Sequence, residues 1–130
     1  MTTDLQYLAF TALLTGSLWI PYIVAQSITN GVLGPENYAD PKPRPVPLWG
    51  QRANRAHINA VEAFAPFAAL VLIAHVAGKA DATTAFCSIA FFWLRLVHAV
   101  VYWLAIPYIR TVVFTLGWIA VVVLFVQVVR

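Results

Sequence analysis

Long apolar segments alternate with short polar ones along the whole chain. Apolar runs of about 20 residues are long enough to cross a bilayer as helices. The pattern predicts four such helices, roughly over residues 5–27, 51–78, 82–105 and 108–129. The last three are separated by turns of only a few residues, so neighbouring helices must run antiparallel. We therefore predict an all-α membrane protein, folded as an antiparallel bundle of four transmembrane helices.

The composition is too apolar for an ordinary soluble domain. Hydrophobic residues make up 62% of the 130 residues and charged residues only 10%. Four spans use up the chain, so we expect a single membrane domain over residues 1–130, in contact with membrane lipids. The three histidines lack the spacing of metal ligands, and no basic nucleic-acid patch is present. Neither a metal site nor a nucleic-acid partner is predicted.

Prolines mark the places where the helical pattern is interrupted. Pro21 falls inside the first predicted span and should kink it. The segment 30–50 contains a proline-rich run at residues 41–47, which suits an extended connector at the membrane surface, with a polyproline ligand motif as the alternative. Pro66, within the second span, is placed to bend that helix.

The basic residues predict the orientation of the chain. Most of them flank the first and third loops, namely Lys42, Arg44, Arg52, Arg55 and Arg110. Lys79 and Arg130 lie at the other end of the predicted bundle. Because cytoplasmic loops carry an excess of Lys and Arg, we expect these two loops in the cytoplasm and both termini outside it.

Polar and charged residues gather on one face of the second span. At 100° per residue, an arc of roughly 80° holds Arg52, Arg55, Asn59 and Glu62. Glu62 lies about three turns inside an otherwise apolar helix, where an unpaired carboxylate is costly. It therefore needs a partner.

The third span carries a second polar face. Arg95, His98 and Tyr102 follow the spacing i, i+3, i+7 and share one side of the helix. Arg95 lies about 20 Å along the span, so we predict that it pairs with Glu62. On one interpretation these residues have a purely structural role and hold the bundle or an oligomer together. Alternatively, the excess of cationic groups over Glu62 leaves room for a ligand that carries carboxylates.

Three blocks of residues resemble the MAPEG family, the membrane-associated proteins in eicosanoid and glutathione metabolism. The first, Gln-Arg-x-x-Arg-Ala-His-x-Asn-x-x-Glu-x-x-x-Pro, covers residues 51–66. The second, Arg-x-x-His-x-x-x-Tyr, covers residues 95–102. The third is an arginine that opens the last helix after a proline-containing turn, matched by Pro107 and Arg110.

The resemblance implies a homotrimer of four-helix protomers that binds glutathione, as a cosubstrate, between neighbouring subunits. It assigns Arg110 the catalytic role of stabilising the glutathione thiolate. The candidate glutathione-binding residues are Arg52, Arg55, Asn59, Glu62, Arg95, His98, Tyr102 and Thr111. The other partner would be a lipophilic small molecule or a lipid, arriving through the membrane.

The expected function is that of a glutathione-dependent transferase or peroxidase acting on lipophilic electrophiles. Thr111 and Phe114 stand where the prostaglandin E synthase branch of the family has serine and tyrosine, which argues against prostaglandin synthesis. The resemblance is closer to microsomal glutathione transferases and to short bacterial-type members, and the latter likeness leads us to expect a bacterial inner membrane as the location. A non-catalytic lipid-binding or scaffold protein of the same family is the alternative.

Overall fold

The computed structural model describes residues 1–130, and every regular element in it is a helix. The elements are α1 (Thr3–Ser17), α2 (Ile20–Asn30), α3 (Pro35–Ala39), α4 (Leu48–Val76), α5 (Ala82–Trp103) and α6 (Ile109–Val129). Four segments are long and apolar enough to cross a membrane: Thr3–Asn30, Leu48–Val76, Ala82–Trp103 and Ile109–Val129. The all-α fold with four membrane-spanning segments is thus confirmed.

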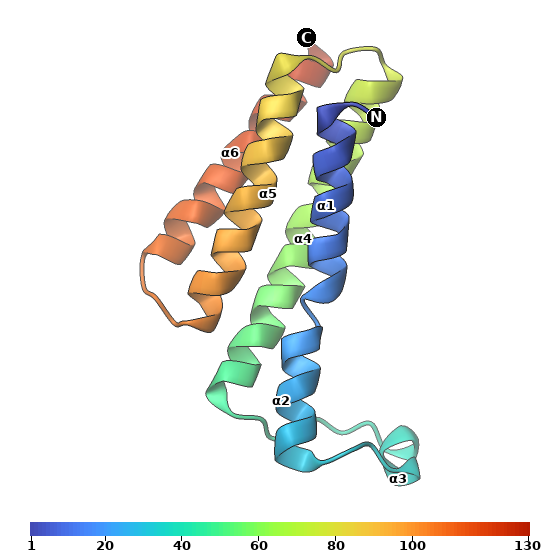
Figure 1. Ribbon diagram of the computed structural model, residues 1–130, viewed down its shortest axis with the longest axis vertical. Coiled ribbons are helices and arrows are strands. Elements are labelled where there is room, and N and C mark those ends of the chain that lie inside the picture. Colours follow the sequence, from blue (N-terminus) through green and yellow to red (C-terminus); the bar gives the residue numbers. More distant parts are fainter.

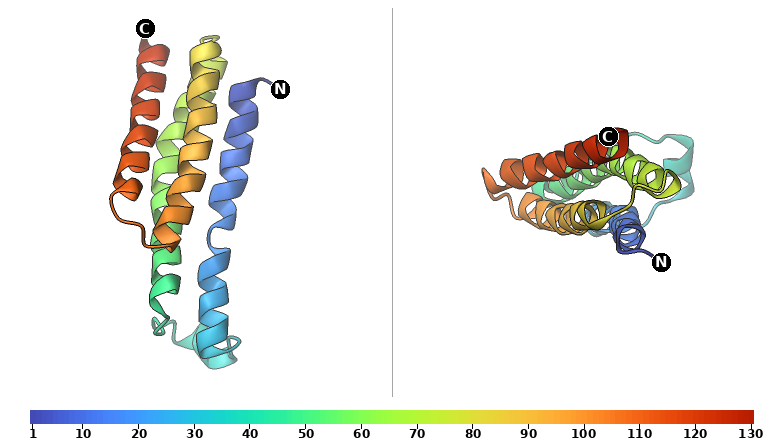
Figure 2. Two further views of the ribbon diagram at one scale, coloured as in Figure 1. Left: turned by 60° about the vertical axis from the view of Figure 1, so that its left-hand side comes forward. Right: turned by 90° about the horizontal axis from the view of Figure 1, so that it is seen from above.

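The long helices stand side by side as a narrow bundle, with both termini at one end and the loop that carries α3 at the other (Figure 1). α4 and α5 form the centre, and α5 contacts α1, α4 and α6. Seen from above, α1 and α6 lie on opposite sides of this central pair (Figure 2). Consecutive spans therefore run antiparallel, as the short turns predict.

The first span is broken rather than bent. α1 ends at Ser17, Leu18 and Trp19 form a turn, and α2 begins at Ile20. Pro21 lies in the first turn of α2, where its missing N–H removes no helical hydrogen bond. The break falls where it does because a proline ring clashes with the carbonyl four residues earlier, which here belongs to Ser17.

The other helix boundaries differ from the predicted ones by a few residues. α4 begins at Leu48 rather than 51, directly after the extended Pro47, and passes through Pro66 without ending. It ends before Gly78, whose φ of +68° a residue with a side chain rarely adopts. The short helix α3 within the proline-rich connector was not predicted, since five residues give too little periodicity to detect.

The interior is small, and most large apolar side chains face outward. Only 24 of the 130 residues are buried, so most of the apolar surface is left for contact with lipid or with other membrane helices. The main core cluster joins α4, α5 and α6, and at its centre the rings of Phe67 and Phe91 stack with centroids 3.9 Å apart. This contact fixes α4 against α5 beside the polar residues described below.

The turn between α4 and α5 is held by a capping box. The Asp81 carboxylate accepts hydrogen bonds from the backbone amides of Thr83 and Thr84, at 2.8 and 3.0 Å. The Thr84 hydroxyl in turn accepts one from the Asp81 amide at 2.9 Å. Lys79 Nζ donates to the Val128 carbonyl at 2.7 Å and so ties the turn to the end of α6. These bonds satisfy helix-terminal groups that would otherwise be unpaired.

Replacing the cap should loosen this end of the bundle. We expect Asp81→Ala to lower the free energy of unfolding by about 1 kcal/mol, because two amides at the start of α5 lose their acceptor. Denaturant unfolding of the purified protein in detergent, followed by circular dichroism, measures the loss. Asp40→Ala is the control, since Asp40 only pairs with Lys42 on the exposed loop. Equal stabilities of the two variants would contradict the role of the cap.

The basic loop end of the bundle leads us to propose that this end faces the cytoplasm. Lys42, in the loop at that end, and Thr2, at the opposite end, are both exposed. A membrane-impermeant maleimide should therefore label Thr2→Cys in intact cells and Lys42→Cys only after permeabilisation. The native Cys87 is buried and gives the background in both variants. The reverse pattern of labelling would show that the chain is inverted.

Candidate functional site

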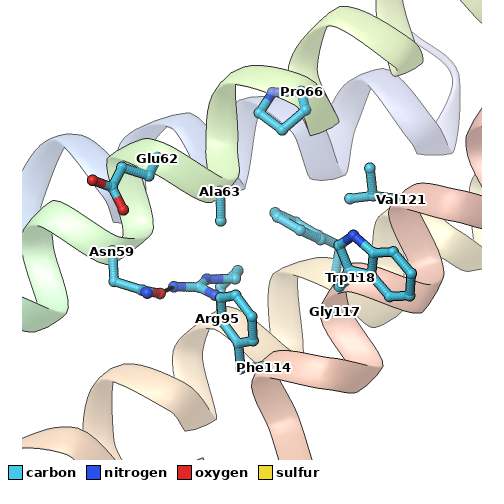
Figure 3. A pocket seen from close by; sticks show the side chains of 10 residues that line it. Asn59, Glu62, Ala63, Pro66, Arg95, Phe114, Gly117, Trp118 and Val121 are labelled. Carbon is cyan, nitrogen blue, oxygen red and sulfur yellow. Dashed lines mark hydrogen bonds between the residues drawn. The ribbon is translucent and has the colours of Figure 1, made fainter. Parts of the chain in front are cut away.

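Two adjoining pockets, each of about 230 Å³, lie between α4, α5 and α6. Asn59 and Phe114 line both of them, so the two pockets lie next to each other. The pocket nearer the α5–α6 turn is otherwise lined by His98, Tyr102, Arg110 and Thr111. The deeper pocket has a polar end at Asn59, Glu62 and Arg95 and an apolar end farther along α4 and α6 (Figure 3).

Arg95 is the most deeply buried charged group of the site, with 4% of its surface exposed. Its Nη2 donates a hydrogen bond to Asn59 Oδ1 at 2.6 Å, and the two side chains point toward each other across the pocket (Figure 3). The same nitrogen lies 3.4 Å from His98 Nδ1. Arg95 Nε is buried and has no hydrogen-bond partner. A buried donor without an acceptor is costly, so Arg95 is the least satisfied polar group of the site.

The predicted pair between Arg95 and Glu62 was wrong, because Asn59 occupies the position opposite Arg95. At 100° per residue, Asn59 lies about 80° around α4 from the buried Phe67, at the edge of the inward face. Glu62 lies about 140° from Phe67, and its side chain is exposed. The carboxylate therefore borders the pocket from the outside of the bundle and does not turn into it.

A row of rings leads from Arg95 to the start of α6. His98 and Tyr102 meet edge to face with centroids 5.6 Å apart, and the guanidinium carbon of Arg110 lies 4.4 Å from the centre of the Tyr102 ring. Such a cation–π contact positions the arginine without neutralising it. Tyr108 adopts a φ of +66° in the tight turn that precedes α6. This turn brings Arg110, in the first turn of α6, opposite Tyr102 on α5.

The MAPEG family model matches residues 5–130, almost the whole chain. The chain belongs to the MAPEG family. Its four apolar helices agree with a multi-pass membrane protein. Members of the family take part, broadly, in membrane-bound glutathione and eicosanoid metabolism. No curated protein matches the sequence.

In this MAPEG protein, most of the residues singled out from the sequence come together. Those that line the two pockets are Asn59, Glu62, Arg95, His98, Tyr102, Arg110 and Thr111. Two do not line them. Arg52 Nε donates to the Trp103 carbonyl at 3.0 Å, which satisfies the last turn of α5, and Arg55 is exposed on the outer side of α4.

Sequence reasoning missed the apolar residues that line the deeper pocket. Gly117, Trp118 and Val121 follow Arg110 at i+7, i+8 and i+11, so they lie near the same face of α6. This spacing was the available signal. It was overlooked because glycine and tryptophan in an apolar span usually mark helix packing or the membrane interface.

The charges around the pockets are predominantly positive. Arg95 and Arg110 contribute two guanidinium groups, and no carboxylate lies within ion-pairing distance of either. Glu62 is the one carboxylate on the pocket lining. An arrangement of this kind favours a ligand with more negative than positive charge. No group of three or more His, Cys, Asp or Glu side chains is placed to hold a metal ion.

Removing the acceptor of Arg95 should destabilise the bundle. In Asn59→Ala the buried guanidinium loses its short hydrogen bond, so we expect a loss of about 1.5–3 kcal/mol in the free energy of unfolding. Denaturant unfolding in detergent gives this quantity. Asn54→Ala is the matched control, since Asn54 lies on the same helix and makes no side-chain hydrogen bond. A similar stability of the two variants would show that the Arg95–Asn59 contact contributes little.

Proposed function

We propose that this protein is a glutathione-dependent transferase or peroxidase that acts on lipophilic electrophiles. One observation carries the proposal. Two guanidinium groups without a carboxylate partner, those of Arg95 and Arg110, line the pockets between the membrane-spanning helices. Glutathione has two carboxylates, one ammonium group and a thiol. Arg95 and Arg110 suit its anionic groups, and Glu62, at the rim, suits the ammonium.

The exposed polar groups support assembly with further copies of the chain, which we propose to be the homotrimer that the family resemblance implies. Glu62 is exposed and lies at the middle of α4, a helix long and apolar enough to cross a membrane. A charged group that faces lipid at the centre of a membrane-spanning helix costs roughly 2.5–3.5 kcal/mol on insertion scales. Arg55 is exposed on the same side of α4. A neighbouring protomer packed on this side would remove Glu62 from lipid and would close the pockets into a binding site at which Arg55 contributes.

In the proposed chemistry Arg110 acts on the sulfur of glutathione. A free thiol has a pKa of about 8.5 and is mostly protonated at neutral pH, whereas a nearby guanidinium favours the thiolate. The thiol proton leaves to solvent, and the thiolate then forms a bond to the electrophilic carbon while the leaving group departs with its electron pair. With a hydroperoxide, two glutathione thiols are oxidised to the disulfide as the peroxide is reduced to alcohol and water.

The remaining polar residues would position glutathione rather than react with it. Asn59 and His98 border both the buried guanidinium of Arg95 and the pocket surface. Tyr102 holds Arg110 by its ring, and Thr111 offers a hydroxyl beside it. Holding the thiolate and the electrophile side by side accounts for much of the rate gain in reactions of this kind.

Arg110→Ala tests the proposal. Removing the guanidinium should reduce thiolate formation on bound glutathione at neutral pH by about tenfold or more, since a neighbouring charge shifts a pKa by about 1–3 units. The ultraviolet absorbance of the thiolate, followed as glutathione is titrated into protein in nanodiscs, measures the change. Arg130→Ala, at the other end of α6, is the control. Absence of glutathione binding to the unaltered protein would refute the proposal.

The apolar half of the deeper pocket favours one other candidate function, that of a non-catalytic lipid-binding or scaffold protein. Pro66, Trp118 and Val121 offer an acyl chain an apolar surface without any need for a thiolate. On that alternative, Arg110→Ala leaves lipid binding intact, and glutathione gives no thiolate signal in either protein. The same titration therefore separates the two functions.

A further inference from the structure

The apolar end of the deeper pocket is a separate part of the site, which glutathione with its many charged and polar groups does not explain. Pro66 comes from α4, Phe91 from α5, and Gly117, Trp118 and Val121 from α6. In Figure 3, Pro66, Gly117, Trp118 and Val121 lie beyond the polar pair of Asn59 and Arg95, away from the charged end. The site thus changes from charged to apolar with distance from the α5–α6 turn.

Gly117 interrupts the row of packing residues on α6. The inward face of this helix carries Val113, Gly117, Ala120 and Leu124, all buried. A Cβ atom built on Gly117 would meet no atom of another helix within 4 Å, so this glycine does not serve a close approach of two helices. Gly50 shows the contrast, because a Cβ there would lie 2.6 Å from the Cβ of Ala25. The open space beside the buried Gly117 is the pocket itself.

The walls around this space suit a compact aromatic group. Phe91 is held rigidly by its stack on Phe67, with ring centroids 3.9 Å apart and an interplanar angle of 10°. Phe114 and Trp118 flank the opposite side and are partly exposed, at 41% and 60%. The whole deeper pocket, its polar end included, has a volume of about 230 Å³, which is smaller than the roughly 300–1,000 Å³ of pockets for drug-sized ligands. Aromatic walls favour a ring, which gains from offset and edge-to-face contacts.

The apolar end, at Gly117, lies near enough to the charged end, at Arg110, for both to belong to one substrate site. Gly117 follows Arg110 by seven residues, which corresponds to about 10 Å along the helix. Phe114 lies between them and lines both pockets. A ring near Gly117 would therefore lie about two helical turns along α6 from Arg110, in the apolar part of the site.

We propose that Gly117 determines the substrate size: by lacking a side chain it keeps open a subsite for a compact aromatic group of the electrophile. This inference rests on the proposed function for the identity of the second substrate, but the subsite itself rests on the geometry of α4, α5 and α6. A side chain at residue 117 would fill the space and exclude the ring. Gly117 is thus a specificity-determining residue and not a catalytic one.

The test compares Gly117→Leu with Gly16→Leu in full-length protein reconstituted in nanodiscs. Gly16 is the matched control, since a Cβ there also meets nothing within 4 Å but the residue lies on α1, outside the pocket. The probe is dinitrobenzene, which is unreactive and quenches tryptophan fluorescence. Trp118→Phe identifies the part of the quenching that comes from the pocket.

We expect saturable quenching in the unaltered protein and in Gly16→Leu, and affinity lower by about tenfold or more in Gly117→Leu, because the ring no longer fits. Turnover of chlorodinitrobenzene with glutathione should fall in kcat/KM by a similar factor, whereas that of methyl iodide, which has no ring, should change little. Unchanged glutathione binding by Gly117→Leu shows that the variant is folded.

The outcomes separate this inference from the proposed function. If the protein binds no glutathione, saturable dinitrobenzene binding that Gly117→Leu abolishes, while the variant keeps the circular dichroism spectrum and thermal unfolding of the unaltered protein, would sustain the subsite and refute the transferase. Glutathione binding together with equal dinitrobenzene affinity in Gly117→Leu and Gly16→Leu would overturn the subsite. Trp118 quenching by brominated phospholipid that only Gly117→Leu abolishes would show that an acyl chain occupies the space, which also overturns it.

Discussion

A guanidinium group inside a membrane-spanning bundle has to be surrounded by polar atoms, and Arg95 imposes this requirement on the helices around it. Its short hydrogen bond to Asn59 joins the centres of α4 and α5, and its contact with His98 holds the neighbouring turn of α5. These two helices form the middle of the molecule, against which both α1 and α6 pack. This polar contact, together with the stack of Phe67 on Phe91, thus holds α4 and α5 side by side at the site.

The site follows from this contact in two directions. Toward the α5–α6 turn, the ring of Tyr102 positions Arg110, and the guanidinium of Arg110 adds a second positive charge. Away from the turn, the stacked rings of Phe67 and Phe91 close the polar region and begin an apolar one. A molecule with charged groups and a sulfur fits the first region, and a small apolar group fits the second. The proposed transfer of glutathione to a lipophilic electrophile needs both regions side by side.

The polar residues on the outer side of α4 indicate why a single protomer is an incomplete unit. Arg52 satisfies the end of α5 within its own chain, but Arg55 and Glu62 are exposed along a helix that crosses the membrane. Lipid is a poor surrounding for either charge, whereas a second copy or a zwitterionic ligand supplies opposite charges. Family membership and exposure therefore support the same proposal of an oligomer with a site at its protomer boundaries.

The sequence by itself determined the number of spans, their antiparallel order and the residues of the polar faces, because hydropathy and the 3.6-residue period are local properties. Only the tertiary structure decided which residue faces Arg95, since Asn59 and Glu62 differ by a rotation around α4 that matters only once α5 is placed beside it. It also decided that Gly117 borders open space rather than a neighbouring helix. These features depend on the distances between helices, which no single helical period contains.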